Sequence, residues 1–189
     1  MIWFYRLLIP AIWLVYLSYW WYRSRGVKRA VRIEAALPGR LRAVMLWTAV
    51  ILMSYPIPPR FLERMLWHRS AFTYWGGVLV VVAGVLFSVW ARQHLAGNWS
   101  QSVTIKENHE LITSGPYRLA RHPIYTGILT GFLGTAIVIA ELRGVLALLL
   151  VTIVFWFKLR LEEKWMREEF GEKYAEYSSR VAALIPGVL

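Results

Sequence analysis

Long apolar blocks alternate with polar segments along the chain, and this pattern predicts the architecture. A helix needs about 20 apolar residues to cross the hydrocarbon core of a bilayer. Blocks of this length or somewhat shorter occupy Ile2–Tyr22, Leu41–Tyr55, Phe72–Trp90, Pro123–Ala140 and Val145–Phe157. We therefore expect an all-α integral membrane protein with about five transmembrane helices.

Two polar regions flank the last two blocks, and we expect the chemistry there. They are the long segment Arg92–Arg121 and the tail Lys158–Leu189. The turn Glu141–Gly144 makes the last two spans an antiparallel hairpin, which brings both polar regions to one membrane face. We expect a cofactor pocket between the loop before the fourth span and the C-terminal helix. The chain then divides into three N-terminal spans, residues 1–91, and a catalytic region, residues 92–189.

The charge distribution orients these spans. Of 189 residues, 58% are hydrophobic and 17% are charged, and the formal net charge is +11. Basic residues gather in the loop Arg23–Arg42, in the third loop and in the tail. Such loops lie in the cytoplasm and bind anionic lipids. We therefore expect an inner membrane protein with membrane lipids as partners and its active site facing the cytoplasm. This distribution does not favour nucleic-acid binding.

The residue types exclude some kinds of chemistry. The chain has no cysteine, which excludes disulfides, thiolate metal sites and cysteine nucleophiles. His68 and His94 have no partners at the spacing of metal ligands, so we expect no metal. Gly127 and Gly131 have the spacing of helix-packing residues. They would pack within one chain or between two, so the oligomeric state stays open.

Arg121, His122 and Pro123 stand at the predicted start of the fourth span. Proline suits the first turn of a helix, where its missing N–H costs nothing. The free N–H groups and the helix dipole at that end favour an anionic group. The motif therefore predicts a site for a carboxylate or phosphate. The alternative is a pair of basic residues that caps the span at the membrane interface.

Glu162 stands where the last span leaves the membrane. Ionisable residues at this depth are costly, and they usually have a function. Glu168, Glu169 and Glu172 follow in a segment that fits a solvated amphipathic helix, with pairs such as Glu169 and Lys173. We therefore assign a functional role to Glu162 and a structural role to the later glutamates.

Several polar motifs follow one another in the second half of the chain. They are Gly97-Asn98-Trp99-Ser100, His109–Tyr117 (HELITSGPY), Arg121–Gly127 (RHPIYTG), Glu162-Glu163 and Phe170–Tyr177 (FGEKYAEY). In their order and spacing they resemble the isoprenylcysteine carboxyl methyltransferase family and its bacterial and archaeal relatives. The resemblance covers about half of the chain, from Gly97 to Pro186.

This resemblance implies an S-adenosylmethionine-dependent methyltransferase in the membrane of a bacterial or archaeal cell, acting on a lipophilic substrate that enters from the bilayer. The implied reaction is carboxyl methylation of an isoprenylcysteine-like acceptor. The implied cofactor-binding residues are His109, Glu110, Leu111, Ile112, Tyr117, Arg121, His122, Pro123, Ile124, Tyr125 and Glu162. The implied catalytic residues are Glu162, Lys158 and Arg160. Lys158 stands where the family has a substrate-side arginine, and Arg160 is the alternative for that role.

Other classes of protein fit part of the same pattern. A phospholipid or lipid-amine N-methyltransferase would have a similar cofactor site and a different acceptor. An NADPH-dependent membrane reductase of the sterol-reductase type shares the Arg-His-Pro-x-Tyr motif, although the tail Glu162–Tyr177 favours methyl transfer. A non-catalytic membrane scaffold is a further alternative, and it predicts no cofactor binding.

Overall fold

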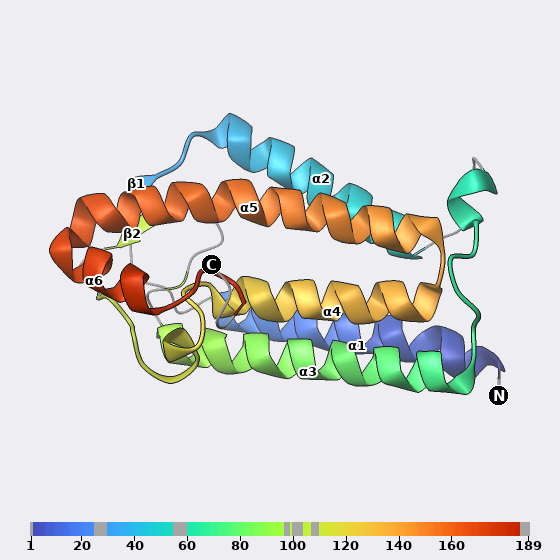
Figure 1. The fold of residues 1–189 in the computed structure, drawn as a ribbon. Helices are drawn as coiled ribbons and strands as arrows, with labels where there is room; N and C mark the ends of the chain where they lie inside the picture. The colour runs from blue at the N-terminus through green and yellow to red at the C-terminus, as the bar shows by residue number, and fades with distance from the viewer. Residues whose placement is uncertain are drawn as a thin grey trace.

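Long helices run side by side through the part of the chain that the computed structural model describes, which is residues 2–24, 30–54, 60–96, 99, 104–106 and 110–185 (Figure 1). The long helices are α1 (Ile2–Arg23), α2 (Ala36–Ser54), α3 (Ala71–Leu95), α4 (Pro123–Ile139) and α5 (Leu142–Phe170). Shorter elements are α6 (Glu172–Arg180), the 3-10 turns η2 (Arg60–Glu63) and η4 (Gly115–Arg118), and the antiparallel strands β1 (Ala30–Ile33) and β2 (Thr104–Lys106).

The long helices suit a bilayer. α2, α3 and α5 are each long and apolar enough to cross a membrane, and α4 is apolar but shorter, with 17 residues. Large apolar side chains such as Leu79, Leu86 and Trp156 are exposed on the outside of the bundle. Lipid would cover these side chains in place of water. The all-α membrane fold expected from the sequence is therefore confirmed.

α2 is longer than the sequence pattern predicted. It begins at Ala36, whereas the apolar block begins at Leu41. Pro38 falls in the first turn of the helix, where a missing N–H breaks no hydrogen bond. The last residues of the expected basic loop therefore belong to a helix.

α5 also extends beyond its apolar block. It continues from Leu142 to Phe170, and it ends at Gly171, whose φ of 51° is left-handed. At 1.5 Å per residue, about 20 residues cross the hydrocarbon core. Counted from Leu142, Glu162 therefore falls about where α5 would leave the hydrocarbon core.

α3 and α4 pack closely because glycines of the two helices face each other. A Cβ added to Gly84 would lie 2.5 Å from the carbonyl oxygen of Gly127, and one added to Gly127 would lie 2.5 Å from that of Gly84. Gly77 and Gly134 make a second contact of the same kind. Gly127 therefore packs within one chain, which settles one of the two possibilities that the sequence left open for this residue.

α1 is attached to α3 and α4 by polar contacts. The Tyr16 hydroxyl and Ser88 Oγ lie 2.6 Å apart, and Trp13 Nε1 donates to Thr135 Oγ1 at 3.0 Å. Hydrogen bonds between membrane helices stabilise their packing by about 0.6 kcal/mol each. These hydrogen bonds link α1 to both helices of the pair.

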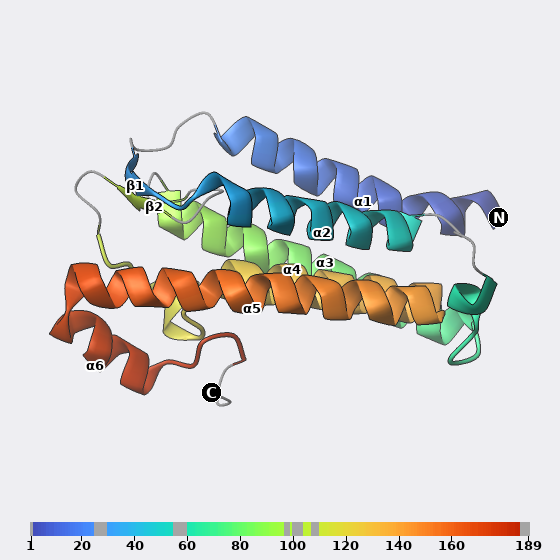
Figure 2. The same cartoon turned by 90° about the horizontal axis from the view of Figure 1, so that it is seen from above.

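The two ends of the bundle hold different elements. α4 and α5 form the predicted antiparallel hairpin, and their turn lies at the end that also holds η2; we call this the turn end (Figures 1 and 2). The opposite end holds β1, β2, α6 and the start of α4; we call this the site end (Figures 1 and 2). Both polar regions predicted to carry the chemistry meet at the site end.

Candidate functional site

Charged side chains gather where α4 begins and α5 leaves the membrane. His122 Nδ1 lies 3.5 Å from Glu162 Oε2, and His122 Nε2 lies 3.4 Å from Glu163 Oε1. The Tyr125 hydroxyl donates to Glu162 Oε1 at 2.6 Å, and Lys158 Nζ lies 3.8 Å from the same oxygen. Glu162 thus contacts side chains of both helices, and we call these five residues the charge cluster.

Ring stacking holds the charge cluster in place. The Tyr125 ring stacks on His122, with centroids 5.4 Å apart and planes 2° apart, and on Phe155, with centroids 4.6 Å apart and planes 9° apart. The Lys158 ammonium lies 5.3 Å from the centroid of the same ring. Stacked rings have little rotational freedom, so the polar atoms of Tyr125 and His122 stay directed at Glu162.

Arg121 fastens the loop before α4 to α5 and to the C-terminal tail. Its Nε donates to Glu163 Oε1 at 2.7 Å, and its Nη1 donates to the carbonyls of Ser178, at 3.0 Å, and Val181. Backbone N–H groups of residues 121–122 donate to the carbonyls of residues 182–183 at 2.9 Å. The positive charge of Arg121 is therefore used within the chain.

The loop before α4 has a conformation that needs particular residues. Gly115 has a φ of 58°, and a Cβ at this position would also clash with the imidazole of His94. Pro116 follows in the first turn of η4. The Tyr177 hydroxyl donates to the carbonyl of Tyr117 at 2.6 Å, and burial raises the pKa of Tyr177 to about 12, so the phenol is a neutral donor. α6 thereby fixes the position of the loop.

His122 carries a charge that depends on its neighbours. Burial alone would lower its pKa, but the contacts with Glu162 and Glu163 outweigh burial and raise the pKa above its ordinary value. The folded protein therefore favours an imidazolium between two carboxylates. This cation compensates part of the negative charge at the membrane exit of α5.

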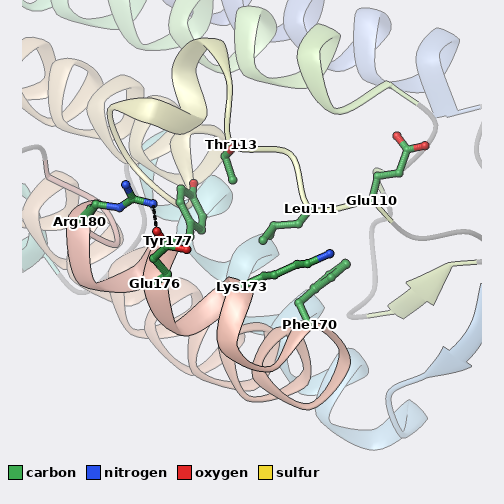
Figure 3. Close-up of a pocket in the computed structure, with 8 residues that line it drawn as sticks. All are labelled: Glu110, Leu111, Thr113, Phe170, Lys173, Glu176, Tyr177 and Arg180. Carbon is green, nitrogen blue, oxygen red and sulfur yellow. Dashed lines mark hydrogen bonds and ion pairs between the residues drawn. The ribbon is translucent and has the colours of Figure 1, made fainter.

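An open cavity of about 500 Å³ lies between the loop before α4 and α6 (Figure 3). The loop lines it with Glu110, Leu111 and Thr113, and the other wall includes Phe170, Lys173 and Tyr177. This volume falls in the range of small-molecule sites, about 300–1,000 Å³. The cavity lies between the two segments that the sequence predicted as its walls.

The predicted cofactor-binding residues fall into three groups. His122, Tyr125 and Glu162 meet in the charge cluster, while Glu110 and Leu111 line the cavity. The third group is buried or partly buried. Tyr117 and Ile124 belong to the hydrophobic core, Ile112 packs against it, and Pro123 begins α4.

Three predicted residues do not join these groups. Arg121 binds Glu163 and a carbonyl of the C-terminal tail. Arg160 is exposed, and its guanidinium lies 5.2 Å from the centroid of the Trp156 ring. Side chains two residues apart on a helix point in different directions, so Arg160 faces away from Glu162 whereas Lys158 faces it. His109 lies outside the described residues, as do three of the four residues in the motif beginning at Gly97.

Motif reasoning left some residues of this region without a role. Glu163 contacts both His122 and Arg121, and Lys173 lines the cavity. Both stand inside the motifs that carried the resemblance, so the motifs alone could have marked them as candidates. Glu34 and Arg42 form an ion pair near the start of α2, and no motif pointed to them.

Comparison with known proteins gives a consistent result. The sequence profile of the phospholipid methyltransferases matches residues 72–173. A probable protein-S-isoprenylcysteine O-methyltransferase of Oryza sativa subsp. indica is 29% identical over 143 residues, covering 72% of this chain and 75% of the rice protein. The cobalt-zinc-cadmium resistance protein CzcN of Cupriavidus metallidurans is 31% identical over 112 residues, covering 58% of this chain and 47% of that protein.

A solved structure has the same fold. It is the eukaryotic intramembrane Ras methyltransferase ICMT (isoprenylcysteine carboxyl methyltransferase), which matches this chain with a TM-score of 0.56 and 24% sequence identity. The match covers 82% of this chain and 55% of the solved chain, so this protein spans about half the length of that one. The likeness extends over most of the bundle described above.

Proposed function

The chain belongs to the phospholipid methyltransferase family, and we propose that it transfers a methyl group from S-adenosylmethionine to the carboxylate of an isoprenylcysteine-like lipid acceptor. The observation that carries the proposal is the charge cluster, in which Lys158 and His122 meet Glu162 at the membrane exit of α5. The name of the rice relative supports the choice of acceptor. The catalytic region would be residues 92–189, as the sequence predicts.

The cavity fits S-adenosylmethionine in size and in residue type. Its volume of about 500 Å³ is that of a small-molecule site. Phe170 and Tyr177 offer aromatic surface for an adenine ring, and Leu111 offers apolar surface. Lys173 would hold the carboxylate of the cofactor, and Glu110 would accept hydrogen bonds from its ammonium or ribose hydroxyls.

The task of the protein in this reaction is to position the reactants and to exclude water. When bound, S-adenosylmethionine supplies a methyl group whose C–S bond breaks as the C–O bond of the ester forms. A carboxylate acceptor is already a nucleophile, so no strong general base is needed. Lys158 would hold the acceptor carboxylate. Glu162, fixed by His122 and Tyr125, would orient a cationic group of the cofactor.

The position of the charge cluster suits an acceptor that is dissolved in lipid. Glu162 lies where α5 leaves the membrane, and the cavity lies beyond this point, against α6. A lipophilic acceptor would reach Lys158 from the bilayer, and the cofactor would reach the cavity from water. The basic loop Arg23–Arg42 supports a cytoplasmic position for this side of the bundle, and we propose that it lies in the inner membrane of a bacterial or archaeal cell.

Methylation of a phospholipid amine is the second candidate, because the family profile carries the name of phospholipid methyltransferases. An amine acceptor is cationic before it reacts and would be repelled by Lys158, which lies 3.8 Å from the carboxylate of Glu162. An anionic acceptor would be attracted to the same ammonium. The charge of Lys158 therefore favours the carboxylate over the amine.

Calorimetry on detergent-purified protein tests the cofactor. We expect S-adenosylmethionine to bind and NADPH not to bind. Lys173→Ala removes the cavity cation and should weaken S-adenosylmethionine binding about 10-fold. Lys164→Ala is the matched control, because Lys164 is 71% exposed and does not line the cavity. Binding of NADPH in place of S-adenosylmethionine would assign the protein to the reductases.

A radiolabelled methyl donor then tests the acceptor. We expect label to enter N-acetyl-S-farnesylcysteine in a base-labile ester, and not phosphatidylethanolamine. Label in phosphatidylethanolamine alone would establish the second candidate. Cofactor binding without label in either compound would contradict the isoprenylcysteine acceptor while leaving the methyltransferase class in place.

A further inference from the structure

A second shielded ion pair lies at the start of α2, outside the residues that the family profile matches. Arg42 Nη2 donates to Glu34 Oε2, and the two side chains are 14% and 5% exposed. A Cβ added to Gly39 would lie 3.9 Å from Glu34 and 4.0 Å from the guanidinium of Arg42. The proposed methyl transfer, as described above, gives this pair no role.

The packing of α2 on α5 directs Arg42 toward the charge cluster. The helices are antiparallel, because Arg143 near the start of α5 donates to the carbonyls of Leu52, at 2.8 Å, and Met53, at 3.3 Å, at the end of α2. Arg42 comes ten residues before Leu52, so it lies about 15 Å farther along α5 than Arg143, toward the C-terminal end of α5. Helical side chains tilt toward the N-terminus of their own helix, so Arg42 extends further in the direction of Lys158.

Arg42 also lies on the inner face of α2. Met45 and Ala49, three and seven residues later, pack in the same hydrophobic core as Tyr125 and Leu159. Positions with this spacing share one helix face. The charges of Arg42 and Glu34 act on Lys158, and the charge of Arg42 acts on Tyr125. The ion pair and the charge cluster therefore share one electrostatic environment.

A guanidinium offers more hydrogen bonds than Glu34 accepts. Arginine has five N–H donors in a planar fork that matches a carboxylate. Within the described residues, the hydrogen bond found for Arg42 is the one to Glu34. Donors of Arg42 are thus left for a second carboxylate.

We propose that Arg42 recognises the carboxylate of the acceptor together with Lys158, and that Glu34 holds the guanidinium in position until the acceptor binds. This inference rests on the proposed function, and it restricts the substrate class to lipophilic carboxylic acids. Arg42 is then a specificity-determining residue, contributed by a helix outside the catalytic region.

The experiment compares the wild-type chain with Arg42→Gln, Arg42→Lys and Arg40→Gln. N-acetyl-S-farnesylcysteine is the acceptor, and its carboxamide is the competing ligand. Arg42→Gln should raise the KM for the acid about 10- to 100-fold, with a smaller change in kcat and unchanged S-adenosylmethionine affinity. Arg42→Lys should lie between wild type and Arg42→Gln. Arg40 is exposed on the same helix, so Arg40→Gln should behave as wild type.

The preference for acid over amide separates recognition from a merely structural role. Wild-type protein should bind the acid more tightly than the carboxamide, and Arg42→Gln should lose this preference. Glu34→Gln removes the competing carboxylate, so it should lower the KM for the acid. Glu34→Gln therefore tests the same binding site while Arg42 stays in place.

Several results would overturn the inference. One is an Arg42→Gln protein with unchanged KM and unchanged preference for the acid. Another is a joint loss of thermal stability and S-adenosylmethionine affinity with the preference kept, which would make Arg42 structural. A wild-type protein that binds the cofactor but binds acid and amide equally would refute the inference alone. Failure to bind the cofactor would refute the proposed function, while the binding comparison of acid and amide would still decide the role of Arg42.

Discussion

Both ends of the bundle bury charged side chains, but the partners of these charges differ. At the turn end, Glu141 accepts hydrogen bonds from Arg143 Nε, at 2.5 Å, and from Arg69. Arg143 also binds the carbonyl of Leu52, and Arg69 binds that of Ile139 at 2.6 Å. These carbonyls belong to the last turns of α2 and α4, where no helical N–H is left to bind them. The turn-end charges therefore complete helix ends.

At the site end, the carboxylates are shared among side chains. His122 lies 3.4–3.5 Å from Glu163 and Glu162, beyond the usual hydrogen-bond range of about 2.7–3.2 Å. The side chain of Glu162 is 22% exposed, whereas that of Glu141 is 11% exposed. Titratable side chains whose pKa values are shifted by specific charged partners are candidates for functional sites. We therefore expect the kind of partner, more than burial, to distinguish a functional charge from a structural one.

Glu162→Gln should produce the largest effect if the two ends differ in this way. The change removes the charge that His122, Tyr125 and Lys158 contact. We expect kcat/KM for methyl transfer to fall about 100- to 1,000-fold, with an unfolding temperature close to that of wild type. Glu169→Gln, at an exposed position of the same helix, should keep full activity. An active Glu162→Gln enzyme would remove Glu162 from the mechanism.

Arg143→Met tests the turn end in the opposite sense. It leaves the carbonyls of Leu52 and Met53 without their donor and removes one partner of Glu141. Breaking a buried pair in this way costs about 3 kcal/mol, so chemical denaturation in detergent should show a large loss of stability. The folded fraction should keep wild-type activity. A stable but inactive protein would show that the turn end is not merely structural.

Gly127→Ala tests the helix pair that connects the two ends. The new methyl group would lie 2.5 Å from the carbonyl oxygen of Gly84, so α3 and α4 would have to move apart. Overpacking of this kind costs about 1–3 kcal/mol, and both stability and activity should fall. Gly76→Ala is the matched control, because a Cβ there meets nothing within 4 Å, and it should leave both unchanged or raise stability slightly.

The sequence was sufficient to predict the α4–α5 hairpin and the two walls of the cavity. Both depend on local features, namely the lengths of the apolar blocks and the residues of the turn Glu141–Gly144. The contact between Tyr125 and Glu162 then follows from antiparallel packing. The preference for Lys158 over Arg160 also follows from helical spacing, once α5 is known to continue to Phe170.

The position of Arg42 could not be predicted in the same way. The composition of the segment from Arg23 to Arg42 indicates a basic loop, and Pro38 supports that interpretation. In the structure α2 already begins at Ala36, and its register on α5 is fixed by a contact between residues 52 and 143. A contact between residues so far apart in the chain leaves no pattern in one sequence.

The pH dependence of stability is the smallest expected effect, and it depends on the protonation of one side chain at the site end, His122. Burial lowers the pKa of His122, but Glu162 and Glu163 outweigh burial and raise it. Its contribution to stability is therefore fully present below the unfolded pKa of about 6.5 and is lost as pH rises through the raised folded pKa.

The unfolding temperature of wild type should decline as pH rises from the unfolded pKa through the folded pKa of His122, and His122→Gln should remove that part of the decline. His68→Gln, at an exposed position near the turn end, should keep the decline. An unchanged decline in His122→Gln would mean that Lys158 and Arg121 alone balance the two carboxylates.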